Sequence, residues 1–185
     1  MSDASAFDNL HPGHHSIRLK GVDYSGPGFY LVTICSLRRR CIFGEVRRAQ
    51  VSLNILGKLA HECWVQIPTH FRWVTLLDFV VMPNHVHGII EIARQQGRDG
   101  AGPLRRMNTN PYTSAGSLGV IVRSFKAIVT KRAHLELKQH GQIWQTNYYE
   151  TIIRPGRELT NARAYIGENP QKWQWDQENP GRHTR

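Results

Sequence analysis

Long apolar runs, paired cysteines and acidic residues are all scarce in this chain. No run approaches the ~20 consecutive apolar residues that a membrane-spanning helix needs, so we expect no membrane association. The first 15 residues hold no apolar segment of the kind found in secretory signals, and we therefore expect a cytoplasmic protein. The three cysteines, Cys35, Cys41 and Cys63, form no CxxC pair and cannot all be paired, so reduced thiols are expected.

The charge balance is strongly basic, because 24 lysine and arginine residues face only 14 aspartate and glutamate residues. A formal net charge of +10 on a small domain points to a polyanionic partner, usually a nucleic acid. The chain of 185 residues suits one ordinary domain with its own core. Its hydrophobic share of 40% is typical of a soluble globular protein.

The hydrophobic pattern predicts seven elements in the order β-α-β-β-α-β-α. Strands are expected at 29–35, 73–82, 85–92 and 143–154, and helices at 50–67, 117–135 and 158–168. The first six elements follow the ferredoxin-like split βαβ order, an α+β fold with two helices on one face of an antiparallel sheet. The opposite face is then free to carry a site, which the third helix can approach.

Composition divides the chain into an irregular basic arm (1–28), one domain (29–170) and a polar tail (171–185). Residues 94–116 are rich in glycine, arginine and proline and show little periodicity. We expect a mobile loop inserted in the domain there, and no domain boundary.

Two histidines open the third expected strand, directly after a Pro83–Asn84 turn signal. Side chains alternate along a strand, so His85 and His87 point to the same side, with Cα atoms roughly 7 Å apart. Two imidazoles at that spacing can bind one divalent metal ion. On this motif alone, a pair of hydrogen-bonded strand histidines is an equally good interpretation.

The third helix places Tyr165 and Asn169 four positions apart, and therefore on one face. A separate stripe of Leu159, Ala162 and Ile166 can pack on the body of the domain. A structural tyrosine, followed by an ordinary Asn-Pro helix stop, explains these residues as well.

Two basic groups are candidate phosphate contacts. The run Arg38, Arg39 and Arg40 follows the first strand, and Arg123, Lys126 and Lys131 lie on the second helix. Basic residues on loops and helices are often only solvated, so both interpretations stay open for the arginine run.

Taken together, these motifs resemble the single-tyrosine HUH transposases, and within them the REP-associated tyrosine transposases. The His-hydrophobic-His motif lies in 81–88, VMPNHVHG, and the tyrosine-helix motif Tyr-Ile-x-x-Asn-Pro lies in 165–170, YIGENP. Further matching stretches occur at 24–25, 30–33, 117–126 and 144–150. The resemblance covers most of 16–180, with the two motifs in the family's order.

The resemblance implies a metal-dependent endonuclease and strand transferase that acts in DNA transposition and recombination. The resemblance also implies DNA binding. The substrate would be single-stranded DNA, expected as a REP-type hairpin. Tyr165 would attack the phosphodiester and form a 5′-phosphotyrosine intermediate, leaving a free 3′-OH. His85, His87 and Asn169 would hold Mg²⁺ or Mn²⁺, which stabilises charge on the phosphate, and no other cofactor is needed.

Several alternatives stay open beside this interpretation. The protein can be a catalytically silent hairpin-binding module, or a relaxase or replication initiator of the same HUH type. Tyr148 and Tyr149 are rival nucleophiles, although strand positions facing the core suit them better. Glu91 and Glu168 are candidate carboxylates behind the metal ligands. Both a monomer and a homodimer are compatible with one motif of each kind per chain.

Overall fold

The computed structural model describes residues 26–93 and 117–182. The loop expected at 94–116, and nearly all of the arm expected at 1–28, lie outside the described residues. Within the described part, no helix is long and apolar enough to cross a membrane.

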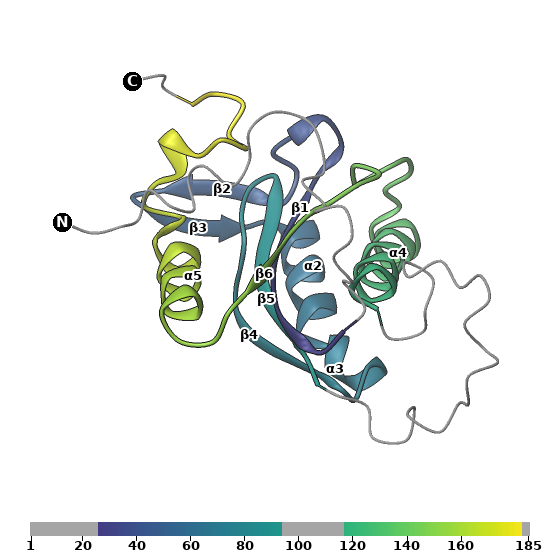
Figure 1. The fold of residues 1–185 in the computed structure, drawn as a ribbon. Coiled ribbons are helices and arrows are strands. Elements are labelled where there is room, and N and C mark those ends of the chain that lie inside the picture. The colour runs from purple at the N-terminus through teal and green to yellow at the C-terminus, as the bar shows by residue number, and fades with distance from the viewer. Residues whose placement is uncertain (1–25, 94–116, 183–185) are drawn as a thin grey trace.

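A four-stranded antiparallel sheet forms the centre of the molecule (Figure 1). Its strands are β1 (Gly28–Cys35), β4 (Val74–Val81), β5 (His85–Ile92) and β6 (Tyr149–Ile153). They lie in the order β4-β5-β1-β6, and each neighbouring pair is antiparallel. With two crossovers and the first and third strands adjacent in the middle, this is the ferredoxin-like order, so the predicted fold class is confirmed.

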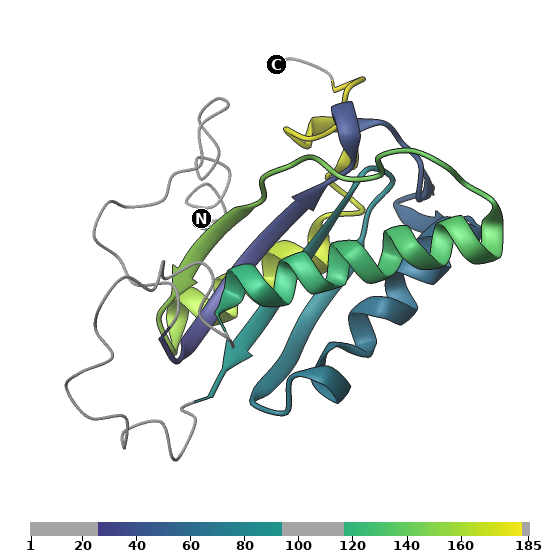
Figure 2. The same cartoon turned by 90° about the vertical axis from the view of Figure 1, so that its right-hand side faces the viewer.

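Helices cover the two faces of the sheet unequally. Figures 1 and 2 show α2 (Ile55–Val65) and α4 (Leu118–Leu137) on one face, and α5 (Arg157–Glu168) on the other. The short helix α3 (Ile67–His70) follows α2, and short 3₁₀ turns lie at η1 (Leu37–Arg39) and η3 (Trp173–Trp175). Helix α5, the third helix expected from the sequence, therefore packs on the sheet face opposite α2 and α4, which was predicted to be free to carry a site.

Two hydrophobic clusters match the two faces. The larger one joins α2 and α4 to the inner side chains of the strands, with Trp64, Phe125 and Val32 almost fully buried. The smaller one, beneath α5, consists of Leu31, Ile89, Ile153, Ala162 and Ile166. Alternation along β5 therefore sends Ile90 towards α2 and α4, and Ile89 towards α5.

The expected helix at 50–67 begins later than predicted, at Ile55. Residues Gln50–Leu53 instead form β3, which pairs with β2 (Gly44–Arg47) in a separate two-stranded sheet. The side chain of Asn54 accepts a hydrogen bond from the backbone nitrogen of Gly57 and so caps α2. Apolar side chains at 51 and 53 fit strand alternation as well as a helical stripe, which explains the error.

The last expected strand, 143–154, is shorter than predicted. Only Tyr149–Ile153 pairs as β6, while the stretch before it touches β1's end through one bridge between Ser36 and Trp144. The ammonium group of Lys126 donates to the carbonyl oxygens of residues 145, 146 and 147. These carbonyls are therefore satisfied by a side chain, and not by a neighbouring strand.

Candidate active site

The two histidines begin β5 on the face that carries α5. Both side chains are fully buried, and their ring centroids lie 4.3 Å apart. In the β1–β5 ladder, His85 lies opposite Cys35 and His87 opposite Thr33. The predicted pair therefore points to one side of the sheet and converges on one point.

Hydrogen bonds around Asn84 determine the tautomer of His85. Nδ2 of Asn84 donates to the carbonyl oxygens of Arg39 at 3.0 Å and Glu178 at 2.6 Å. These two acceptors orient the amide so that Oδ1 of Asn84 lies 2.8 Å from Nδ1 of His85. Nδ1 therefore carries the proton and donates a hydrogen bond to Oδ1. The lone pair of His85 then lies on Nε2, which is 3.9 Å from Oδ2 of Asp176. Two electron-rich atoms that face each other in this way favour a cation between them.

His87 contacts a hydroxyl group at each ring nitrogen. Its Nδ1 lies 2.8 Å from Oγ1 of Thr33, the buried residue paired with it on β1. Its Nε2 lies 3.4 Å from the phenolic oxygen of Tyr165. The rings of His87 and Tyr165 meet edge to face, with centroids 5.2 Å apart. The structure thus brings the predicted nucleophile to one of the predicted metal ligands.

Asn169 occupies the C-cap of α5, one turn after Tyr165. Only 3% of the residue is exposed. Its Oδ1 is buried and has no hydrogen-bond partner among the described residues. A buried amide oxygen without a donor is costly, and a metal ion is one partner that removes the cost.

Asp176 is a site residue that the sequence analysis missed. Donor atoms of His85, His87 and Asp176 all lie within 4.8 Å of one another, a spacing that allows one metal ion. Oδ1 of Asp176 accepts from the backbone nitrogen of Glu178 at 2.7 Å, whereas its buried Oδ2 has no hydrogen-bond partner in the described part of the chain. One feature of the sequence indicates that this segment packs on the domain: Trp173 and Trp175 lie just before Asp176, and tryptophans in an otherwise polar tail are usually buried at least in part.

A clasp holds this C-terminal segment against the sheet. Glu178 is only 1% exposed, and its carboxylate forms an ion pair with Nε of Arg39 at 2.6 Å. Its backbone carbonyl oxygen accepts the hydrogen bond from Nδ2 of Asn84. The thiol of Cys35 donates to the same carboxylate at 3.2 Å, and burial together with this carboxylate raises the pKa of Cys35 well above its usual range. Burial opposes the charge of Arg39, but the Glu178 carboxylate raises the pKa of this guanidinium. The segment is therefore anchored at Glu178, two residues after Asp176.

The donor set fits a divalent cation. Two imidazole nitrogens and a carboxylate oxygen converge, and the buried Oδ1 of Asn169 lies on the adjacent helix end. Mixed nitrogen and oxygen donors suit Mn²⁺ and are acceptable to Mg²⁺, which prefers oxygen. The buried oxygens on Asn169 and Asp176, which have no donor within 26–93 and 117–182, are the observation that supports a metal ion here.

The predicted carboxylates and rival tyrosines are placed differently. Glu168 forms an ion pair with Lys172 at 2.7 Å on the surface. Tyr148 is buried in the larger core cluster, as expected. Tyr149 lies opposite Thr33 on β6, so it shares the face of His87 and does not point to that core. Burial, then the charge of Glu178, raises the pKa of Tyr149, which disfavours its phenolate.

The predicted basic contacts fall into separate groups. Arg38 and Arg40 are exposed on either side of Arg39, which is engaged by Glu178. Arg123 and Lys131 are exposed on α4, and that helix covers the sheet face opposite α5 (Figure 2). The structure therefore does not bring the α4 residues to the histidines.

Comparisons with known proteins agree with this architecture. No protein-family model matches the chain. It is 42% identical over 168 residues to an uncharacterized protein of Haemophilus influenzae, covering 89% of this chain and 93% of that protein. The structure is similar to that of a REP-associated tyrosine transposase bound to a REP hairpin, with a TM-score of 0.55 and 18% identity over 83% of this chain and 72% of that one. The chain thus belongs to the same protein family as the H. influenzae protein, and it has the fold of that transposase.

Proposed function

We propose that this protein is a tyrosine transposase that nicks and joins single-stranded DNA, with a hairpin of the REP type as its substrate. The observation that carries the proposal is the 3.4 Å contact between the Tyr165 hydroxyl and Nε2 of His87, beside the His85, His87 and Asp176 group. The shared fold supports it, because the similar transposase was solved with a REP hairpin bound. The basic charge of +10 suits a DNA partner.

In this proposal, Tyr165 supplies the nucleophilic oxygen. The oxygen forms a bond to phosphorus while the bond from phosphorus to the 3′ oxygen breaks. The products are a 5′-phosphotyrosine and a 3′-OH, and the reverse attack by a 3′-OH rejoins a strand without an external energy source. In this proposal the site forms within one chain, and the packing of α5 on the sheet of its own chain supports this arrangement.

The surrounding residues orient the site. Asn84 holds His85 with Nε2 unprotonated, and Thr33 orients the ring of His87. A bound Mg²⁺ or Mn²⁺ would be held by His85, His87 and Asp176, with Asn169 as a further ligand, and would polarise the scissile phosphate. Burial of both histidines excludes water from their outer sides and keeps these donors in place.

The decisive experiment is an adduct assay. A labelled single-stranded hairpin is incubated with the protein and Mn²⁺, and denaturing electrophoresis then reveals any covalent protein–DNA complex. The wild type should form this complex and Tyr165→Phe should not, while hairpin binding by the variant stays nearly unchanged.

Tyr149→Phe is the matched control, since Tyr149 lies on the same sheet face but comes from β6 and not from α5. It should still form the complex. Adducts on Tyr165→Phe would refute the assignment of the nucleophile. Tight binding without adducts in any variant would identify a catalytically silent hairpin-binding protein.

A further inference from the structure

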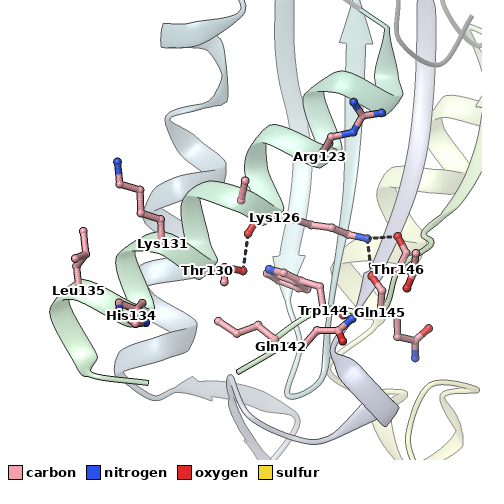
Figure 3. Close-up of a pocket in the computed structure, with 12 residues that line it drawn as sticks. Arg123, Lys126, Thr130, Lys131, His134, Leu135, Gln142, Trp144, Gln145 and Thr146 are labelled. Carbon is pink, nitrogen blue, oxygen red and sulfur yellow. Dashed lines mark hydrogen bonds between the residues drawn. The ribbon is translucent and has the colours of Figure 1, made fainter. Parts of the chain in front are cut away.

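A groove of about 770 Å³ lies between α4 and the 142–146 segment (Figure 3). Helix α4 covers the sheet face opposite α5, the helix that carries Tyr165 (Figure 2). Its inner side is formed by Ile143 and Trp144, and Leu135 lies at one end. Arg123, Lys131 and His134 come from α4, and none of the lining residues is acidic. A cavity of this size is typical of sites for small ligands or for parts of larger ones.

Helical spacing explains why the groove is open and basic. Positions 123, 127, 130 and 134 follow one another at intervals of three or four, and 131 lies four positions after 127, so all five share one face of α4. The small side chains of Ala127 and Thr130 occupy the middle of this face and leave space above them. Longer cationic side chains flank that space, with Arg123 on one side and Lys131 on the other.

The opposite wall is fixed by interactions within the chain. The ammonium group of Lys126 reaches across and donates to the carbonyl oxygens of Gln145 at 2.9 Å and Thr146 at 3.3 Å (Figure 3). It also donates to the carbonyl oxygen of Asn147 at 2.9 Å. Trp144 is held by ring contacts with Phe43 and Phe125, at centroid distances of 5.0 and 5.5 Å. The groove is thus preformed, and Lys126 serves as a structural brace in it.

The groove is connected to the candidate active site through the end of β1. The carbonyl oxygen of Cys35 accepts from the backbone nitrogen of Gln145 at 3.0 Å, and Cys35 is the residue paired with His85. A smaller cavity of about 240 Å³ shares Gln142 and Ile143 with the groove and is also lined by Arg40. The exposed Arg40 of the 38–40 run therefore lies beside the groove.

We propose that this groove binds one unpaired nucleotide of the DNA strand that is engaged at the active site, an inference that rests on the proposed function. The base would lie in the apolar cleft against the 142–146 wall, and the phosphates on its two sides would pair with Arg123 and Lys131. A single strand fits this arrangement better than a duplex, because only an unpaired base can leave the stack and enter a concave site. The site lies outside the chemistry of Tyr165 and would serve to hold the strand.

The test measures binding of a fluorescein-labelled oligothymidylate by anisotropy, in chelator, so that no cleavage contributes. Ala127→Trp fills the groove from an exposed helix position, and Lys131→Glu reverses the charge beside it. Each variant should bind about tenfold more weakly than the wild type, because Ala127→Trp displaces the stacked base and Lys131→Glu repels the phosphate. Lys58→Glu, at an exposed position of α2, is the matched charge control and should bind more tightly than Lys131→Glu.

Photocrosslinking gives an independent readout. An oligonucleotide containing 4-thiothymidine should crosslink to the 142–146 segment in the wild type and lose that crosslink in Ala127→Trp. Wild-type affinity in both groove variants, with melting temperatures unchanged, would overturn the proposal even if Tyr165 adducts form. Weakened binding in these variants, in a protein that forms no adduct, would leave the groove in place and reject the proposed catalysis instead.

Discussion

The phenolic oxygen of Tyr165 lies 3.4 Å from Nε2 of His87, although 78 positions of sequence separate the two residues. Docking of α5 through Ala162 and Ile166 creates this contact, because the same helix buries its apolar stripe on Leu31 and Ile89. The tyrosine is therefore placed by packing, and its position depends on the face of the sheet that α5 covers.

Substitutions at the candidate metal ligands are predicted to weaken metal binding, whereas a substitution at a nearby surface carboxylate is not. His87→Ala should abolish Mn²⁺ binding measured by calorimetry, because it removes a central donor of the group. Asp176→Asn should weaken binding strongly if the carboxylate is a ligand, and Asn169→Ala should weaken it if the amide is one. Glu168→Gln is the control, since that carboxylate pairs with Lys172 on the surface.

Asn84→Ala belongs to the same experiment. It removes no metal donor, but it takes away the acceptor that keeps the proton on Nδ1 of His85 and one of the contacts that hold Glu178. Loss of such a partner typically reduces metal affinity by about 10–100-fold. Unchanged affinity in Asn84→Ala would contradict the tautomer assignment.

The clasp between Arg39 and Glu178 is predicted to hold the Asp176 segment in place. Arg39→Met removes the cation and leaves the Glu178 carboxylate 2% exposed. The unfolding free energy should fall by about 3 kcal/mol, the low end for breaking a buried pair, because Arg39 itself is partly exposed. Hydrogen exchange should accelerate in Trp173–Trp175 and the residues that follow. Arg38→Met, at the exposed neighbouring position, should change neither measurement.

Gly88 is predicted to be essential for the packing of β5. A Cβ at this position would lie 2.2 Å from Cζ2 of Trp64, which is a severe overlap with a rigid ring. Gly88→Ala should therefore lower the unfolding free energy by about 1–3 kcal/mol, measured by denaturant titration. Gly167→Ala is the matched control: nothing lies within 4 Å of its added Cβ, and alanine favours the helix. Equal effects of the two substitutions would contradict this packing argument.

The stability of the protein is predicted to rise with pH because of Lys126. Burial lowers the pKa of Lys126 to about 8. A lysine in an unfolded chain titrates near ~10.4, so between these values the folded protein releases a proton that the unfolded chain retains. The penalty for burying the charge is present below about pH 8 and is relieved above it.

The unfolding free energy, measured across this pH window, should rise with pH in the wild type and should not rise in Lys126→Met. Lys58→Met, on the exposed side of α2, should keep the rise. A rise that persists in Lys126→Met would assign it to another group.

Local sequence patterns determined much of this protein. Alternation placed His85 and His87 on one side of a strand, and helical spacing placed Tyr165 and Asn169 on one side of a helix. The order of strands and helices was sufficient for the ferredoxin-like class, because few topologies satisfy it. Short-range ambiguity caused the errors, as at Gln50–Leu53, where the apolar positions fit both periods.

Only the tertiary structure decided which polar side chains share a site. Asp176 reaches His85 because Arg39, Asn84 and Cys35 hold Glu178, and contacts between loops have no period that a sequence displays. Lys126 resembled its exposed neighbours on α4, yet its ammonium group is bonded to three carbonyl oxygens of a distant segment. The periodicity of a sequence shows which face of an element a residue occupies. What that face meets depends on how the whole chain packs and satisfies its buried polar groups.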